Sequence, residues 1–403
     1  MGIRHTLVAG LVALGLAAQA QEALRPEVGR PLQAAQELIK AQKYKDALAK
    51  VRDADAVPNK SAHESYMVER MRIAAASGAG DAVLAATSFE ALKASGRLPA
   101  AEQLRMLESL AGSFYRAKDY TRTIVWGKRY LAEGGPNAQI RTLVIQSQYL
   151  SGDYAGAAKE LVLEVQGDDK AGRATHEDRL TLLLNAAQRA NDVAAQSLAL
   201  ERLLAHHPKQ AYWADVLARL KRKPGFSDRL ALDTYRLMLA TGSMRRANDY
   251  LEMAQLAVQA GLPGEGQQVV DKGFAAGVLG VGTPAEADRH RRLKDLVARR
   301  VAEERQGVAA RETQAASARG GDDLVSLGFS QTFLGETKKG IALMEKGLAK
   351  GGLKRPDEAR LHLGIAYLAA GDKAKAQAVL KTVAGQDGTA DLARLWLLAA
   401  RQK

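Results

Sequence analysis

Few residues of this sequence lie at spacings that are typical of chemical sites. Two adjacent histidines, His206 and His207, are of a residue type that binds zinc. Adjacent side chains on a helix point about 100° apart, and no third ligand is near in the sequence. We therefore interpret the pair as a solvated helix end before Pro208, and we expect no metal. The absence of cysteine excludes disulfide bonds, thiolate metal ligands and catalytic thiols.

Two short motifs resemble fragments of catalytic or phosphate sites. Gly78-x-Gly80 lacks the third glycine, the following Lys-Ser/Thr and the preceding strand of a phosphate loop. The segment 328–332, Gly-Phe-Ser-Gln-Thr, lacks the second glycine of a nucleophile elbow. No His-Glu-x-x-His helix is present, and the acidic residues are scattered without a distinguished pair. We predict that the protein is not an enzyme and uses no cofactor.

A helical hairpin is the unit around which the chain is organised, best seen in Ala359–Asp372, ARLHLGIAYLAAGD. Leu363 and Tyr367 fall on one helical face. Gly364 has no side chain, so a second helix can approach closely there. Gly371 can adopt the positive φ that ends a helix. One hairpin cannot bury its own apolar face, so copies must stack on it.

Copies of this hairpin are present at regular intervals. Gly328 precedes Gly364 by 36 residues, the turn at 118–120 precedes that at 152–154 by 34, and segment 270–277 resembles segment 344–351. The pattern resembles the tetratricopeptide repeat (TPR), a helix–turn–helix unit of about 34 residues. The resemblance implies an all-α, right-handed α-solenoid of about ten TPR-like helical hairpins with a C-terminal capping helix at 389–401.

Composition divides the chain into four segments. We predict a signal peptide at 1–20, an N-terminal TPR-like solenoid at 21–283, a charged segment at 284–320 and a C-terminal TPR pair with its capping helix at 321–403. The charged segment has few apolar positions. We interpret it as a degenerate repeat with its turn at Gln306-Gly307. One long helix and a basic contact surface are the alternatives.

The first twenty residues have the pattern of a secretory signal peptide. A short basic start, Arg4-His5, precedes an apolar run at 6–18 that is too short to span a bilayer. The small-x-small pattern at 18–20 predicts cleavage after Ala20, with an uncleaved anchor as the alternative. We expect export to a bacterial periplasm. No later stretch is apolar enough to cross a membrane.

The net charge of +13 and the pI of about 9.7 indicate a basic protein. We interpret the excess of Lys and Arg as solvation of the outer faces of many helices. A surface for anionic partners such as nucleic acid, lipid headgroups or acidic proteins is the alternative.

The resemblance to TPR proteins also implies where a partner binds. In that family the first helices of successive repeats line a concave groove that holds an extended peptide or a helix. Carried over to the third and fourth repeats, the groove positions are Arg105, Glu108, Gly112 and Tyr115, and then Gln139, Thr142, Gln146 and Tyr149. We regard Tyr115 and Tyr149 as the strongest candidates, because tyrosine is enriched at binding hot spots. Packing between repeats is the alternative role of both.

These observations predict a non-enzymatic periplasmic scaffold. We expect it to mediate protein–protein interactions for a cell-envelope assembly, transport or export machine, with an envelope protein or peptide as partner. The first alternative is a binder of anionic polymer, an acidic glycan or nucleic acid, through the basic surface. Export and the lack of interleaved aromatic residues disfavour nucleic acid. The second alternative is an envelope enzyme carried on the solenoid.

Overall fold

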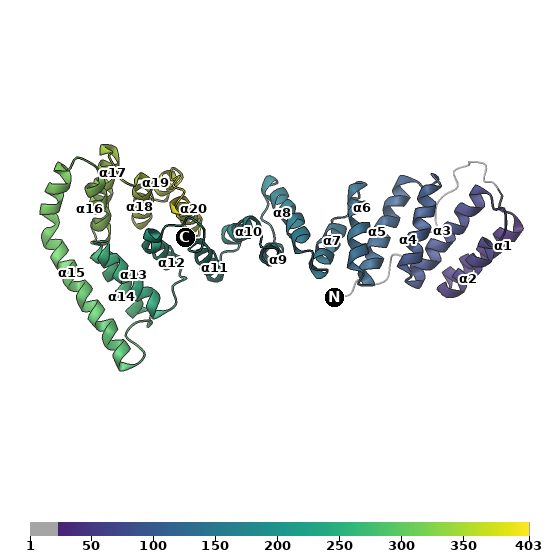
Figure 1. Cartoon of the computed structure of the whole chain (residues 1–403), viewed down its shortest axis with the longest axis horizontal. Coiled ribbons are helices and arrows are strands. Elements are labelled where there is room, and N and C mark those ends of the chain that lie inside the picture. The colour runs from purple at the N-terminus through teal and green to yellow at the C-terminus, as the bar shows by residue number, and fades with distance from the viewer. Residues whose placement is uncertain (1–22, 403) are drawn as a thin grey trace. The chain divides into compact units, whose positions relative to one another are not determined.

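A computed structural model describes residues 23–402. Within this range the backbone forms twenty α-helices and no strand. Helices that follow one another along the chain lie side by side, as Figure 1 shows. The helices that pack in such pairs are α1 with α2, α3 with α4, α5 with α6, α7 with α8, α11 with α12, α13 with α14, α16 with α17, and α18 with α19. The prediction of an all-α helical-repeat solenoid is therefore confirmed.

The chain divides into two units. Unit 1 contains the residues up to Arg173 together with Leu182–Ala195, and unit 2 contains Ala174–Thr181 and the residues from Gln196 onward. The boundary thus lies within 174–195, between the fourth and sixth repeats. The predicted divisions at 283 and 320 follow composition instead, and they stay predictions.

Unit 1 consists of helical hairpins of similar length. Its helices are α1 (Pro26–Lys40), α2 (Tyr44–Asp55), α3 (Ala62–Ala79), α4 (Ala82–Ala94), α5 (Ala100–Arg116), α6 (Tyr120–Ala132), α7 (Ala138–Leu150) and α8 (Tyr154–Lys170), followed by parts of α9 (Glu177–Arg189) and α10 (Val193–His206). Aromatic side chains fill the centre of its core: the rings of Phe89 and Trp126 lie edge to face, 5.4 Å apart.

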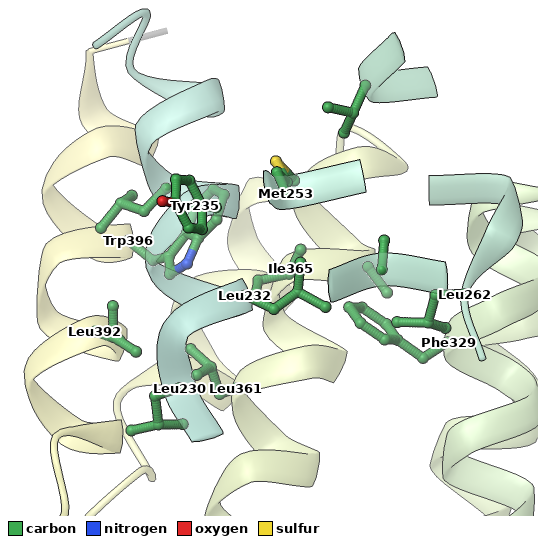
Figure 2. Close-up of a cluster of buried hydrophobic side chains, with 14 of the residues drawn as sticks. Leu230, Leu232, Tyr235, Met253, Leu262, Phe329, Leu361, Ile365, Leu392 and Trp396 are labelled. Atoms are coloured by element: carbon green, nitrogen blue, oxygen red, sulfur yellow. The ribbon is translucent and has the colours of Figure 1, made fainter. Parts of the chain in front are cut away.

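Unit 2 continues with the remaining repeats. Its helices are α11 (Gln210–Leu220), α12 (Ala231–Ala240), α13 (Ala247–Gln259), α14 (Pro263–Ala275), α15 (Pro284–Ser317), α16 (Asp322–Phe333), α17 (Thr337–Lys350), α18 (Pro356–Ala369), α19 (Lys373–Leu380) and α20 (Thr389–Arg401). Figure 2 shows part of its core, in which Leu230 and Tyr235 lie in one apolar cluster with Met253 and Trp396. Helix α20 packs on α12, α18 and α19, as a capping helix does.

The turns have the predicted chemistry. Gly371 has a φ of 80°, and the carboxylate of Asp372 accepts a hydrogen bond of 3.0 Å from the backbone N–H of Lys375. Asp119 and Asp153 cap α6 and α8 in the same way. Each cap satisfies a backbone donor that the first turn of a helix leaves unpaired. These local bonds explain why the helix ends could be predicted from the sequence.

Glycines permit close contact between the helices of a hairpin. A Cβ atom on Gly364 would lie 2.6 Å from Cγ of Leu380, which confirms the predicted close approach. The contact between α16 and α17 is tighter. A Cβ atom on Gly328 would collide with the backbone oxygen of Gly340 and lie 2.7 Å from Cγ of Met344. Backbone atoms cannot move aside as the end of a side chain can.

The charged segment forms one helix, α15, of 34 residues. The interpretation of this segment as a hairpin with a turn at Gln306-Gly307 is wrong, and the long-helix alternative is correct. A capping box at Thr283 and Glu286 starts the helix. A narrow buried stripe that includes Val297 and Val301 packs it against its neighbours. One interior glycine costs a helix only about 1 kcal/mol relative to alanine, so Gly307 does not end it.

The predicted signal peptide lies outside the described residues. None of the helices between residues 23 and 402 combines the length and the apolar character that a membrane crossing needs.

Candidate functional site

The predicted partner-binding residues lie on α5 and α7, the first helices of two successive repeats. The phenol of Tyr115 on α5 donates a hydrogen bond of 2.9 Å to Oε1 of Gln146 on α7. Both side chains are half-buried. The structure thus brings together two residues that were selected on separate repeats. Tyr115 contributes to packing between these repeats and is still partly exposed.

Two further tyrosines, Tyr120 and Tyr154, each pack against one of the predicted tyrosines. The rings of Tyr115 and Tyr120 lie 6.1 Å apart at 60°, and those of Tyr149 and Tyr154 lie 5.3 Å apart at 74°. All four tyrosines are half-buried. We call these four residues the tyrosine row. Edge-to-face pairs of this kind hold aromatic rings in fixed orientations, so the row offers a rigid, partly exposed aromatic surface.

An arginine from the next repeat packs on one end of the tyrosine row, against Tyr149 and Tyr154. The guanidinium of Arg189 lies 4.9 Å from the ring centre of Tyr154 and 5.7 Å from that of Tyr149. Its Nη1 donates a hydrogen bond of 2.7 Å to the hydroxyl of Tyr154. The selection from the sequence did not include Tyr120, Tyr154 and Arg189. The signal for the two tyrosines was present, because each begins the second helix of its repeat and they are 34 residues apart.

The other predicted residues flank the row. Arg105 and Gln139 are exposed, while Gly112 and Thr142 are half-buried. The carboxylate of Glu108, also half-buried, accepts a hydrogen bond of 2.7 Å from the amide of Asn137. All of these residues lie on α5 or α7 or at the start of α7. They thus belong to the first helices of the same two repeats as Tyr115 and Tyr149.

Unit 2 contains a buried cluster of charged residues that the sequence did not reveal. Arg236 of α12 bonds both oxygens of Glu265 on α14, at 2.7 Å each, and Oδ1 of Asp233 at 2.6 Å. His362 of α18 reaches the same Oδ1 at 2.9 Å. The aromatic ring of Phe329 on α16 stacks on the imidazole at 4.4 Å, and Arg236 lies over the same ring at 4.8 Å.

Charge neutralisation stabilises this cluster. Burial raises the pKa of Asp233, but the charges of His362 and Arg236 and their hydrogen bonds lower it by more, so the carboxyl is ionised. Burial lowers the pKa of the Arg236 guanidinium, whereas Glu265 and Asp233 raise it by more. The cluster therefore keeps its charges and joins α12, α14 and α18, with the ring of Phe329 from α16 stacked on it. Its three helices come from distant parts of the sequence. Only the pair Asp233–Arg236, three residues apart on α12, could be recognised in the sequence as a local ion pair.

A cavity of about 270 Å³ lies beside this cluster in unit 2. Helices α12, α13, α14, α16, α18, α19 and α20 contribute to its walls, and Arg236 and Glu265 form part of its lining. Most of the remaining lining is apolar. Trp396 of α20 is also part of the wall, and within the described chain its buried indole N–H has no hydrogen-bond partner.

The motifs that were discounted in the sequence have structural roles. Ser330 lies inside α16, and its hydroxyl donates to the carboxylate of Glu304 on α15. The imidazole Nε2 of His207 lies 2.9 Å from the backbone oxygen of Thr175, and α10 ends at His206. Across residues 23–402, no group of three or more His, Cys, Asp or Glu side chains is placed to hold a metal ion.

No protein-family model matches the chain, and neither does any curated protein. Among solved structures, the chain is similar to the pentatricopeptide repeat protein PPR10 from maize, with 15% sequence identity and a TM-score of 0.27. The similarity covers 91% of this chain and 61% of that chain, so this chain matches less than two thirds of the maize protein's length.

Proposed function

We propose that the protein is a non-enzymatic TPR-type scaffold that binds a peptide segment of a protein partner along α5 and α7. The tyrosine row is the observation that carries this proposal. Its four rings form two edge-to-face pairs, and all four tyrosines are partly exposed. Tyrosine in such a setting offers a large contact area at a small cost in conformational entropy, and it often dominates the energy of an interface.

The chemistry next to the row indicates the kind of peptide. Arg189 is exposed and lies over two of the rings, while Arg105 and Gln139 extend the polar surface on the same helix layer. An apolar or aromatic residue of the partner would contact the rings, and a carboxylate nearby would pair with Arg189. The proposed partner segment therefore combines apolar and acidic residues.

We further propose that the scaffold acts in a bacterial periplasm as part of an envelope assembly, transport or export machine. The support is the signal-like pattern at 1–20 and the absence of cysteine. The test is N-terminal sequencing of the protein from a periplasmic fraction, with Gln21 as the expected first residue. An intact Met1 in a cytoplasmic fraction would contradict the location and leave the partner-binding surface to be judged separately.

Crosslinking in cells, followed by pull-down, tests the binding surface. We expect a discrete partner protein with the unaltered chain and its loss with Tyr115→Ala and Tyr149→Ala. Tyr212→Ala is the matched control, because Tyr212 is half-buried on the first helix of another repeat. Retention of the partner by both tyrosine variants, with helix content unchanged, would place the binding surface elsewhere.

A basic face on α15 supports the second candidate function, the binding of an anionic polymer. Arg289, Arg292 and Arg299 are exposed there, and none forms an ion pair with another described residue. Such a surface predicts affinity for heparin-like polyanions that falls steeply as salt rises. Recovery of polyanions alone in the pull-down, released by salt, would favour this candidate over the scaffold.

A further inference from the structure

The cavity in unit 2 has walls suited to an apolar chain. Leu239, Met253, Val269, Ile365 and Leu368 contribute to the lining, with the Trp396 side chain on the α20 side. Figure 2 shows Met253, Ile365 and Trp396 within the apolar cluster of this unit. Its volume of about 270 Å³ is near the lower end of the range for small-molecule sites.

Two lysines mark the opening of the cavity. Lys272 of α14 and Lys373 of α19 both line it and are both exposed. Within residues 23–402, neither ammonium group forms an ion pair. Two unpaired positive charges at the mouth of an apolar space complement a ligand with an anionic end.

The charges inside the cavity set the orientation of such a ligand. Arg236 is already paired with Glu265 and Asp233, so its positive charge is neutralised before an anion enters. The cluster of Asp233, Arg236, Glu265 and His362 therefore offers an entering anion no unpaired positive charge, whereas the two lysines do. The anionic end therefore stays at the lysines, and the apolar end enters.

We propose that this cavity binds a monocarboxylate with an unbranched alkyl chain of medium length, of the fatty-acid type. The cavity volume of about 270 Å³ lies near the lower end of the range for small-molecule sites, which suits an alkyl chain of medium rather than great length. The alkyl chain lies against Met253 and Ile365, and the carboxylate lies between Lys272 and Lys373. This site is separate from the tyrosine row, and its test does not depend on the proposed scaffold function.

Isothermal titration of the full chain with sodium decanoate, below its micelle concentration, tests the proposal. We expect one saturable site. Decanol carries the same chain without the charge, and we expect it to bind about fivefold more weakly, as two exposed charge pairs allow. In the double variant Lys272→Met and Lys373→Met, the preference for decanoate over decanol should disappear. Lys346→Met, an exposed lysine of α17 outside the cavity, is the matched control.

Filling the cavity gives an independent test. Leu368→Trp and Ala240→Leu each enlarge a half-buried residue of the lining, and we expect both to abolish the binding of decanoate. The exposed lysines can be changed without disturbing the core, so the proposal stays testable if the filled variants do not fold. Equal affinity for decanoate and decanol in the unaltered chain would overturn it. Two other results would also overturn it. One is unchanged binding of decanoate by Leu368→Trp. The other is a loss of the preference for decanoate in Lys346→Met that equals the loss in the double lysine variant.

Discussion

The hydroxyl of Tyr115 lies 2.9 Å from Oε1 of Gln146, which is 31 residues further along the chain. The bond joins the first helices of two successive repeats of unit 1. It makes Tyr115 both a packing residue and part of a partly exposed surface. The two roles can be separated by substitution, because the hydroxyl makes the bond and the ring makes the contact with Tyr120.

Removing only the hydroxyl tests the packing role. We expect Tyr115→Phe to lower the free energy of unfolding by about 0.5–1 kcal/mol, since the lost hydrogen bond is half-exposed. A double-mutant cycle with Gln146→Ala should show coupling of similar size by urea denaturation. Partner binding should survive in Tyr115→Phe. Additive effects of the two changes would show that the hydrogen bond contributes nothing in solution.

Breaking the buried charge cluster should damage unit 2 severely. Arg236→Met leaves the carboxylates of Asp233 and Glu265 buried without their counter-charge, and we expect a loss of about 3–5 kcal/mol in the free energy of unfolding. Arg300→Met is the control, because the ion pair of Arg300 with Glu303 is exposed, and its loss should change stability by less than about 0.5 kcal/mol. Similar effects of both changes would mean that the cluster is hydrated.

Adding a methyl group to two helical glycines should have opposite effects. Gly328→Ala forces α16 away from the backbone of α17, and we expect it to destabilise the protein by about 1–2 kcal/mol. A Cβ atom on Gly307 of α15 would meet nothing within 4 Å, so Gly307→Ala should stabilise by about 0.5–1 kcal/mol through helix propensity. Both are measured by thermal unfolding. A destabilising Gly307→Ala would argue against a continuous α15.

Glu64 should make unit 1 sensitive to acid. Hydrogen bonds from the Arg25 side chain, and then from the backbone N–H of Ser61, lower the pKa of Glu64 from 4.5 to about 2. The unfolded chain binds this proton at higher pH than the folded chain does. The stabilisation is therefore complete above about pH 4.5 and is lost as the pH falls towards about 2.

Replacing Glu64 tests this linkage. We expect Glu64→Gln to melt at a lower temperature at neutral pH and to lose less further stability between about pH 5 and about pH 3 than the unaltered chain. Glu37→Gln, which removes an exposed carboxylate of α1, should have little effect on the melting temperature at neutral pH. An acid profile of Glu64→Gln parallel to that of the unaltered chain would show that another group controls this range.

Most helix ends followed from the sequence because local chemistry sets them. The pattern around Gly371 and Asp372 predicted the end of α18 and the start of α19, and the turns at Asp119 and Asp153 did the same for unit 1. Helix α15 was interpreted wrongly because Gly307 carries no cap. Without a positive φ or a capping side chain, a glycine does not distinguish a turn from a helix interior.

The candidate sites also differ in whether the sequence could reveal them. Tyr115 and Tyr149 could be selected because the repeat period maps equivalent positions onto one helix layer. The cluster of Asp233, Arg236 and Glu265 could not, because Glu265 belongs to another repeat than the pair Asp233–Arg236 of α12 and meets it only when helices pack. The cavity beside it depends on the side chains of seven helices, and no short pattern encodes it.

The sequence by itself determined the helices, their pairing in hairpins and the chemistry of most turns, since hydrogen bonds and apolar periodicity within some 34 residues decide these features. Only the tertiary structure decided the course of α15, the buried ionic cluster, and the cavity with Lys272 and Lys373 at its mouth. Their geometry depends on how non-neighbouring helices fill space against one another, and residues separated by more than a repeat have no local signal of that contact.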